Sequence, residues 1–164
     1  MDEKITLSGV PETMLQTIYA RAKESKDRGA IHDKKAEEII GKLNYDFSLA
    51  DKDAPMHSGV IARTIVLDKL VSEYLAKNPG ATVVNIACGL DTRFYRMDNG
   101  RITWYNVDLP ETIEVRDAIY HESGRVSTIG ISATDPDWAD KVTKRGKMLF
   151  IIEGLSIYLT SDEN

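Results

Sequence analysis

The feature that most constrains the fold is a β-branched apolar run that leads into a turn of very small residues. The run consists of Val83, Val84 and Ile86, Ala-Cys-Gly follows at 87–89, and the helix-starting side chains of Asp91 and Thr92 come next. In open α/β sheets such a junction lies at the carboxyl end of a strand, where backbone N–H groups and a helix dipole face a ligand. We interpret it as a candidate nucleoside cradle. A buried strand that ends in an ordinary turn would give the same pattern, since the full Gly-x-Gly-x-x-Gly fingerprint is absent.

Length and charge exclude several classes of protein. At 164 residues the chain has the size of one globular domain. Its 21 basic and 26 acidic residues give a net charge of −5, and basic residues form only scattered pairs. A nucleic-acid partner is therefore not expected, because binding to a phosphate backbone requires clustered Lys and Arg.

The single cysteine, Cys88, predicts neither an internal disulfide nor a metal site, because no Cys/His spacing accompanies it. The amino terminus at 1–4 lacks the pattern of a signal peptide, and no apolar run approaches the ~20 residues of a membrane span. We therefore expect a cytoplasmic protein with no membrane partner.

Amphipathic periodicity predicts two helices near the amino terminus. The first spans about 11–25, with Arg21 and Glu24 expected on its solvent face. The second begins near Asp33, whose side chain is a plausible cap.

A loop or broken helix is expected at 44–58, followed by a third helix at 59–77. That helix is apolar nearly all round, which is typical of burial against a sheet. Arg63 lies inside its most apolar half. The arginine either reaches the surface or pairs with a carboxylate, or else it grips a ligand carboxylate or phosphate in a cleft.

An acidic residue ends the second predicted strand, at 102–107. Asp108 lies 19 positions after Gly89 (108 − 89), close to the ~20-residue spacing of an acid that binds ribose hydroxyls in this architecture. A carboxylate suits a diol because it accepts two hydrogen bonds at once. The alternative role is an N-cap for a helix that starts at Pro110.

Strands and helices continue to alternate to the end of the chain, as helix 110–121, strand 126–131, helix 137–144 and strand 147–152. The last strand is continuously apolar and is expected to be buried on both faces. This alternation predicts an α/β fold with a doubly wound parallel sheet, and Glu153 then points into the ligand crevice.

Several motifs follow one another along the chain, at 19–25, 61–64, 85–93, 105–110 and 152–159 and in the helix that begins near Asp33. Together they resemble the S-adenosylmethionine-dependent methyltransferases of the leucine carboxyl methyltransferase family. Its bacterial branch is often labelled as polyketide or tetracenomycin-type O-methyltransferases. The resemblance implies a Rossmann-like, seven-stranded methyltransferase sheet with additional amino-terminal helices over the cofactor.

The resemblance assigns a part of the cofactor to each candidate site residue. Arg63 matches the arginine that holds the methionine carboxylate, and Ala87, Cys88 and Gly89 match the loop under the methionine. Asp91 matches the acid that follows this loop. The remaining matches are the ribose acid Asp108 with Leu109 beside it, the adenine contacts Ser132 and Ala133, and Glu153 near the methionine ammonium.

Two positions depart from the family pattern. Ala87 stands where many members have glycine, and Ser132 stands where an acid often contacts adenine. The catalytic residues stay unknown, because the three histidines at 32, 57 and 121 are isolated in the sequence.

Family members are longer than this chain. We therefore expect a helical region at 1–78 over the cofactor site, and at 79–164 the first four strands of the methyltransferase domain. A helix-start signal at 160–164 has no helix after it. A four-stranded piece would leave a sheet edge unpaired and apolar surface bare, which predicts self-association.

The sequence thus favours an O-methyltransferase that acts on a small molecule and converts S-adenosylmethionine to S-adenosylhomocysteine. Two alternatives stay open at this point. One is a non-catalytic cofactor-binding or interaction module, and the other is an NAD-dependent oxidoreductase, since the same fold and ribose acid serve both cofactors. The methyl acceptor and the activity of a chain of this length are not fixed by the sequence.

Overall fold

The computed structural model describes residues 11–160, so the amino-terminal pattern at 1–4 and most of the helix-start signal at 160–164 lie outside it. The chain divides into two compact units. The helical unit comprises Met1–Tyr74 and Leu90–Asp98, and the sheet unit comprises Leu75–Gly89 and Asn99–Asn164.

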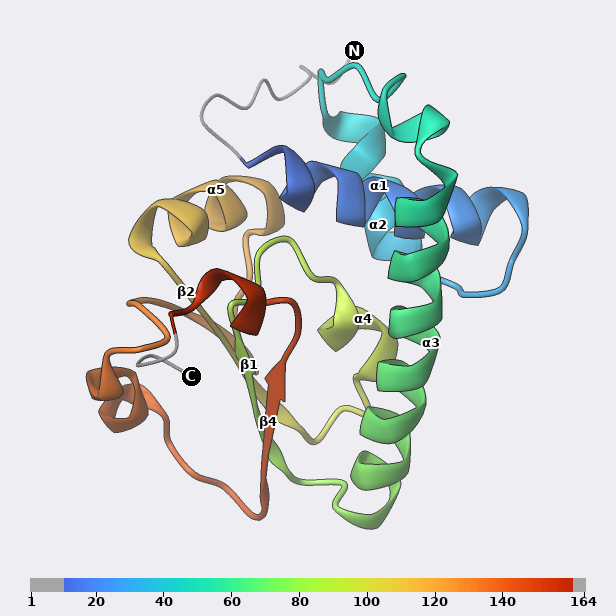
Figure 1. The fold of residues 1–164 in the computed structure, drawn as a ribbon. Coiled ribbons are helices and arrows are strands. Elements are labelled where there is room, and N and C mark those ends of the chain that lie inside the picture. Colours follow the sequence, from blue (N-terminus) through green and yellow to red (C-terminus); the bar gives the residue numbers. More distant parts are fainter. Residues whose placement is uncertain (1–10, 161–164) are drawn as a thin grey trace. The chain divides into compact units, whose positions relative to one another are not determined.

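Helices dominate the helical unit (Figure 1). As predicted, Asp33 caps α2, because its carboxylate accepts a hydrogen bond from the backbone nitrogen of Ala36 at 3.0 Å. The helical segments are α1 (Glu12–Asp27), α2 (Lys34–Lys42), η1 (Ala50–Lys52), α3 (Ala54–Lys77, whose last three residues belong to the sheet unit) and α4 (Arg93–Met97).

The predicted loop at 44–58 is shorter than expected, because α3 already begins at Ala54. The carboxylate of Asp53 accepts a hydrogen bond from the backbone nitrogen of Met56 at 3.0 Å. Pro55 then occupies the first turn, where its missing N–H costs nothing. An Asp followed by a proline two residues later was the signal for this earlier start.

The prediction that Arg21 and Glu24 face solvent is wrong. Both residues are 4% exposed, and each has a polar partner within the helical unit. An Nη atom of Arg21 donates to the carbonyl of Leu90 at 3.2 Å. A carboxylate oxygen of Glu24 lies 2.9 Å from Nε2 of His57. Sequence periodicity missed these side chains because it assigns every charged residue to the surface.

Helix α3 is not buried all round, contrary to the sequence expectation. Val60, Ile61, Val71 and Leu75 are buried. A second stripe is exposed, and Ile65, Val66 and Leu70 are 44%, 57% and 56% accessible to solvent.

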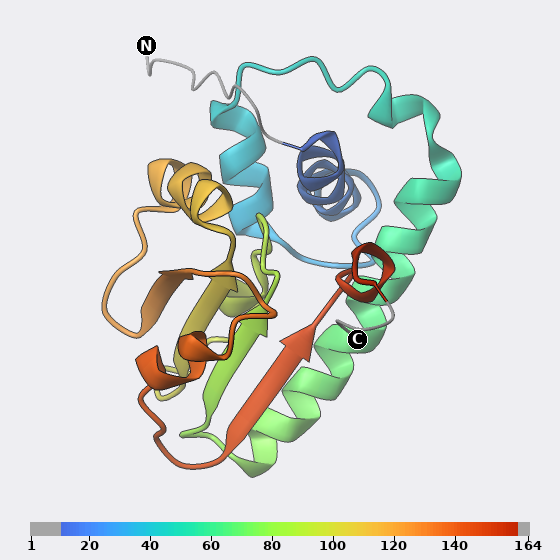
Figure 2. The ribbon, with the colours of Figure 1, turned by 60° about the vertical axis from the view of Figure 1, so that its left-hand side comes forward.

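A parallel sheet of four strands forms the sheet unit, with the order β3-β2-β1-β4 (Figure 2). This confirms the predicted α/β fold. In the central register, Asn85 of β1 pairs with Asn106 of β2 and with Ile151 of β4. The elements of this unit are β1 (Thr82–Ile86), β2 (Thr103–Asp108), α5 (Pro110–Tyr120), β3 (Val126–Gly130), η2 (Pro136–Lys141), β4 (Met148–Ile152) and η3 (Ser156–Tyr158).

One face of the sheet carries a core of Val84, Ile86, Tyr105, Val107 and Ile129. Segment 131–142 packs against this core through its partly buried apolar side chains, of which Trp138 is one. The segment contains the short 3₁₀ helix η2 where the sequence predicted a helix over 137–144. Asp135 accepts a hydrogen bond from the backbone nitrogen of Asp137 and fixes the start of that turn.

Strand β4 is not buried on both faces, which corrects the sequence prediction. Phe150 and Ile152 are 49% and 57% exposed. Within the described residues β4 pairs with β1 alone, so it is an edge strand, seen beside β1 in Figure 2. A continuously apolar strand predicts burial, but its position in the strand order decides how much of it is covered. None of the helices in residues 11–160 is long and apolar enough to cross a membrane.

Candidate functional site

The loop that follows β1 has a tight left-handed backbone. Ala87 and Gly89 adopt φ values of 54° and 47°. Between them, the backbone nitrogen of Cys88 donates to the carbonyl of Val107 at 3.2 Å and so links the loop to β2. Glycine adopts this conformation without a steric cost, which explains Gly89, whereas the Cβ of Ala87 makes it unfavourable at position 87.

Asp108, at the end of β2, holds this loop. Its Oδ2 accepts a hydrogen bond from the backbone nitrogen of Gly89, and its Oδ1 accepts one from the backbone nitrogen of Leu109, both at 2.8 Å. The alternative assignment of Asp108 as the N-cap of α5 is wrong, because Leu109 occupies that position. A carboxylate has about four acceptor positions, so these two bonds leave capacity for the two hydroxyls of a ribose.

Sequence reasoning missed Arg116, which contacts the same loop. Its guanidinium donates to the carbonyl of Gly89 at 2.9 Å and pairs with Glu122 at 2.7 Å. The side chain is fully buried. Burial favours the neutral form of this arginine, but the nearby Cys88 and the bonded Glu122 outweigh it and raise the pKa of Arg116.

One signal for Arg116 was present in the sequence. The inward face of α5 carries Thr112, Ile113, Ile119 and Tyr120, and Arg116 lies on the same face at the helical spacing. A charged residue within an apolar stripe needs a buried partner, and Glu122 just beyond the helix provides it.

The other predicted residues of the sheet unit follow β3 and β4. The backbone nitrogen of Ile131 donates to the carbonyl of Asp108 at 2.8 Å, so the chain leading to Ser132 starts beside the end of β2. The indole nitrogen of Trp138 donates to the carbonyl of Ala133 at 3.2 Å and shapes this turn. Glu153 directly follows β4 and is partly buried.

These residues come to the same end of the sheet because the strands are parallel. Each lies at or just after the carboxyl end of a strand: Asp108 ends β2, and the other three are the loop at 87–89, Ser132 and Glu153. Strand β1 pairs with β2 on one side and with β4 on the other, so the strand order reverses there. Ligands of open α/β sheets bind outside the carboxyl ends of the strands at such a reversal.

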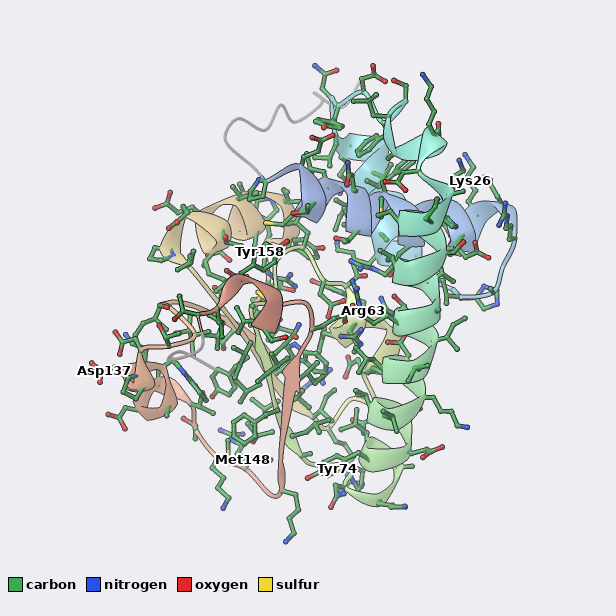
Figure 3. All side chains as sticks on the ribbon, in the orientation of Figure 1. Lys26, Arg63, Tyr74, Asp137, Met148 and Tyr158 are labelled. Atoms are coloured by element: carbon green, nitrogen blue, oxygen red, sulfur yellow. The ribbon has the colours of Figure 1, made fainter. Side chains whose placement is uncertain are left out.

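Two predicted site residues, Arg63 and Asp91, belong to the helical unit. Arg63 is exposed on α3 (Figure 3). The carboxylate of Asp91 accepts from the backbone nitrogen of Arg93 at 3.1 Å and from its guanidinium at 3.0 Å. Arg93 is buried and also pairs with Asp68 at 2.8 Å. Asp91 therefore fixes the start of α4.

Comparison with known proteins identifies the family. The sequence model of leucine carboxyl methyltransferase matches residues 14–164. The chain belongs to the leucine carboxyl methyltransferase family. The match covers both units and confirms the resemblance that the sequence motifs indicated. It also agrees with a Rossmann-like methyltransferase fold.

Two relatives of this chain are named as methyltransferases. The tetracenomycin polyketide synthesis O-methyltransferase TcmP of Streptomyces glaucescens is 40% identical over 164 residues, which cover 97% of this chain and 60% of the relative. The S-adenosyl-L-methionine-dependent methyltransferase dpfgK of Gibberella zeae is 32% identical over 179 residues, which cover 98% of this chain and 59% of the relative. The chain thus spans about 60% of the length of these two curated relatives.

Proposed function

We propose that this chain binds S-adenosylmethionine and serves methyl transfer to a carboxylate or hydroxyl oxygen of a small molecule. The observation that carries the proposal is the contact between Asp108 and Gly89. It joins a carboxylate with free acceptor capacity to a loop of minimal side chains, at the strand-order reversal of a parallel sheet. Membership of a methyltransferase family and the names of the two relatives support it.

The residues at the carboxyl end of the sheet suit a nucleoside with a small charged substituent. In this proposal Asp108, next to Leu109, accepts hydrogen bonds from the ribose hydroxyls, and Ala87, Cys88 and Gly89 lie under the methionine part. Ser132 and Ala133 contact adenine. Because Ser132 carries no charge, it offers a weaker acceptor there than an acid would.

Charged groups of the chain complement the amino-acid part of the cofactor. We assign the methionine ammonium to Glu153 and the methionine carboxylate to Arg63, with Asp91 as the acid that follows the loop. An arginine suits a carboxylate because its planar fork donates two parallel hydrogen bonds.

When bound, S-adenosylmethionine would supply the methyl group of its positively charged sulfur to the acceptor oxygen. The electron pair of the C–S bond would stay with the sulfur of S-adenosylhomocysteine, and a hydroxyl acceptor would also release its proton to solvent. The protein contributes alignment of the two reactants and a pocket that excludes water. A carboxylate acceptor is already ionised near neutral pH and needs no base, whereas a phenol is helped by one.

Calorimetry with S-adenosylhomocysteine and with NAD tests the proposal. We expect the chain to bind S-adenosylhomocysteine and not NAD, and Asp108→Ala to weaken that binding by at least about tenfold, because hydrogen bonds to a charged group are lost. Asp117→Ala is the matched control, since Asp117 is an exposed carboxylate on α5. Binding of NAD alone would identify an oxidoreductase, and binding of neither would identify an interaction module.

We further propose that the chain associates with a second copy through the edge of its sheet. Phe150 and Ile152 extend the face that carries Val84 and Ile86, because they pair in register with those residues. They are about half exposed, and within the described residues their strand neighbours β1 alone and is an edge of the sheet. An exposed apolar edge strand is a template for pairing with another chain.

In the same proposal the protein acts in the cytoplasm, where a cysteine that forms no disulfide, such as the buried Cys88, stays reduced.

A further inference from the structure

Both polar groups at Gly89 are held by buried or partly buried side chains of the sheet unit. Its N–H donates to Asp108 at 2.8 Å, and its carbonyl accepts from Nη1 of Arg116 at 2.9 Å. Asp108 has a place in the proposed site, whereas Arg116 does not, because its fully buried side chain is covered by the protein. Arg116 is thus a buried cation that contacts the loop without being part of the proposed site.

Glu122 fixes the guanidinium of Arg116 in one orientation. Nε of Arg116 donates to Oε2 of Glu122 at 2.9 Å, and Nη2 donates to Oε1 at 2.7 Å. The ring of Tyr120 covers the guanidinium, with 4.1 Å between the charged carbon and the ring centre. Because the guanidinium is planar, this bidentate contact leaves Nη1 aimed at the carbonyl of Gly89.

The carboxylate of Glu122 is in turn held from the centre of the sheet. Nδ2 of Asn106 donates to Oε2 of Glu122 at 3.1 Å. The Oδ1 atom of Asn106 accepts from the indole nitrogen of Trp104 at 3.0 Å. Asn106 and Trp104 are completely buried in β2. The loop is therefore tied to the buried centre of the sheet through Arg116.

A buried ion pair of this kind is costly to form and seldom stabilises a fold more than apolar residues of similar volume. Stabilisation of the fold alone therefore does not account for the ion pair between Arg116 and Glu122. The loop that it contacts has two residues with positive φ, Ala87 and Gly89, and such a backbone has several competing conformations. Hydrogen bonds on both sides of Gly89 select one of them.

We propose that Arg116 and Glu122 are positioning residues that hold the 87–89 loop in its ligand-binding conformation before the cofactor arrives. The inference rests on the proposed function for the identity of the ligand. Preorganisation raises affinity because the free protein already populates the competent state. If loss of the Arg116 contact reduces that population to about one tenth, the Kd for the ligand rises about tenfold.

Two variants of Arg116 and one control test this inference. Arg116→Met removes the charge and the donors, and Arg116→Lys keeps the charge but offers a single donor group, which cannot reach both Glu122 and Gly89 in the same geometry. The control is Arg125→Met. Arg125 also donates to a backbone carbonyl, that of Ile102 at 3.2 Å, but at the amino end of β2, away from the loop.

Three readouts separate positioning from general stability. Calorimetry gives the Kd for S-adenosylhomocysteine, urea unfolding gives the stability of each variant, and NMR hydrogen exchange follows the N–H of Gly89. We expect both Arg116 variants to raise the Kd about tenfold and to accelerate exchange of Gly89 relative to the central amides of β1 and β2. Arg125→Met should leave the Kd and the relative exchange of Gly89 unchanged.

Unchanged exchange of Gly89 in Arg116→Lys would overturn the inference, and so would an equal rise of the Kd in Arg125→Met. If Arg116→Met does not fold, the lysine variant decides alone. If the unmodified chain does not bind S-adenosylhomocysteine, the proposed function is wrong, whereas the exchange of Gly89 still decides whether Arg116 positions the loop.

Discussion

Oδ2 of Asp108 lies 2.8 Å from the backbone nitrogen of Gly89, nineteen residues earlier in the chain. The contact joins the end of β2 to the loop after β1. Asp108 and Gly89, whose spacing in the sequence is typical of ribose-binding proteins, therefore lie in contact at the carboxyl end of the sheet. The same carboxylate therefore has a structural task and a proposed binding task.

The structural task predicts a loss of stability in Asp108→Asn. The N–H groups of Gly89 and Leu109 donate to different oxygens of Asp108, and asparagine replaces one of these oxygens with an NH2 donor, so one N–H loses its acceptor. We expect the free energy of unfolding to fall by about 1–3 kcal/mol, measured by urea denaturation. Asp117→Asn, on the exposed face of α5, should change it by less than about 0.5 kcal/mol. Equal stability of the two variants would contradict the anchoring role of Asp108.

Ala87→Gly should stabilise the chain. Alanine at φ 54° carries a steric cost of about 1–2 kcal/mol that glycine does not. The greater freedom of glycine in the unfolded chain offsets about 0.4–1 kcal/mol of this gain. We expect a net gain of about 0.5–1 kcal/mol in urea unfolding. A loss of stability would mean that the methyl group of Ala87 makes packing contacts worth more than the strain.

Gly146 should tolerate alanine less well than Gly124 does. Both have positive φ, at 65° and 74°. A Cβ at Gly146 would lie 2.8 Å from the carbonyl oxygen of Gly80, whereas a Cβ at Gly124 meets nothing within 4 Å. Gly124→Ala should cost about 1 kcal/mol of stability from the backbone conformation alone, and Gly146→Ala about 1–3 kcal/mol more. Equal stabilities of the two variants in thermal and urea unfolding would contradict the predicted difference.

The folded chain should lose stability above pH 10 because of Tyr19. Burial and the hydrogen bond to Asp51, at 2.8 Å, raise the pKa of Tyr19 to about 12 from its ordinary value of 10. Between these values the unfolded chain releases the proton and the folded chain keeps it. This contribution to stability is therefore complete below pH 10 and disappears as the pH approaches 12.

Urea unfolding at several alkaline pH values measures the effect of Tyr19. Tyr19→Phe should flatten the decline between pH 10 and 12, because the group that titrates is gone. Tyr45→Phe is the control, since it leaves the bond between Tyr19 and Asp51 in place. A steeper decline in Tyr19→Phe than in the unmodified chain would contradict the sign of this argument.

Self-association through the sheet edge should depend on Ile152. A lysine there places a charge on the exposed face of β4 and opposes strand pairing, so Ile152→Lys should shift the chain towards monomer by about tenfold in dissociation constant. Val66→Lys on α3 is the matched control, because Val66 and Ile152 are both 57% exposed. Sedimentation velocity over a range of concentrations measures both variants. A compact monomer at all concentrations, or equal dissociation by Val66→Lys, would exclude the edge of β4 as the interface.

The sequence alone determined the fold class and predicted that the candidate residues of the sheet unit lie at strand ends. Alternating apolar runs and helical periods predict a parallel α/β sheet because each period matches one kind of backbone repeat. The spacing between Gly89 and Asp108 predicted their common edge, since parallel strands bring their carboxyl ends together. These features depend on local chemistry and on a topology that few alternatives satisfy.

The tertiary structure decided those features that depend on contacts between residues distant in the sequence. Arg21 and Glu24 are buried because polar partners distant in the sequence satisfy them, at Leu90 and His57. Phe150 is exposed because strand order places β4 at an edge. The role of Arg116 depends on Glu122 and on a carbonyl 27 residues away. Periodicity reports which face a residue occupies, but only the packed chain determines what lies opposite that face.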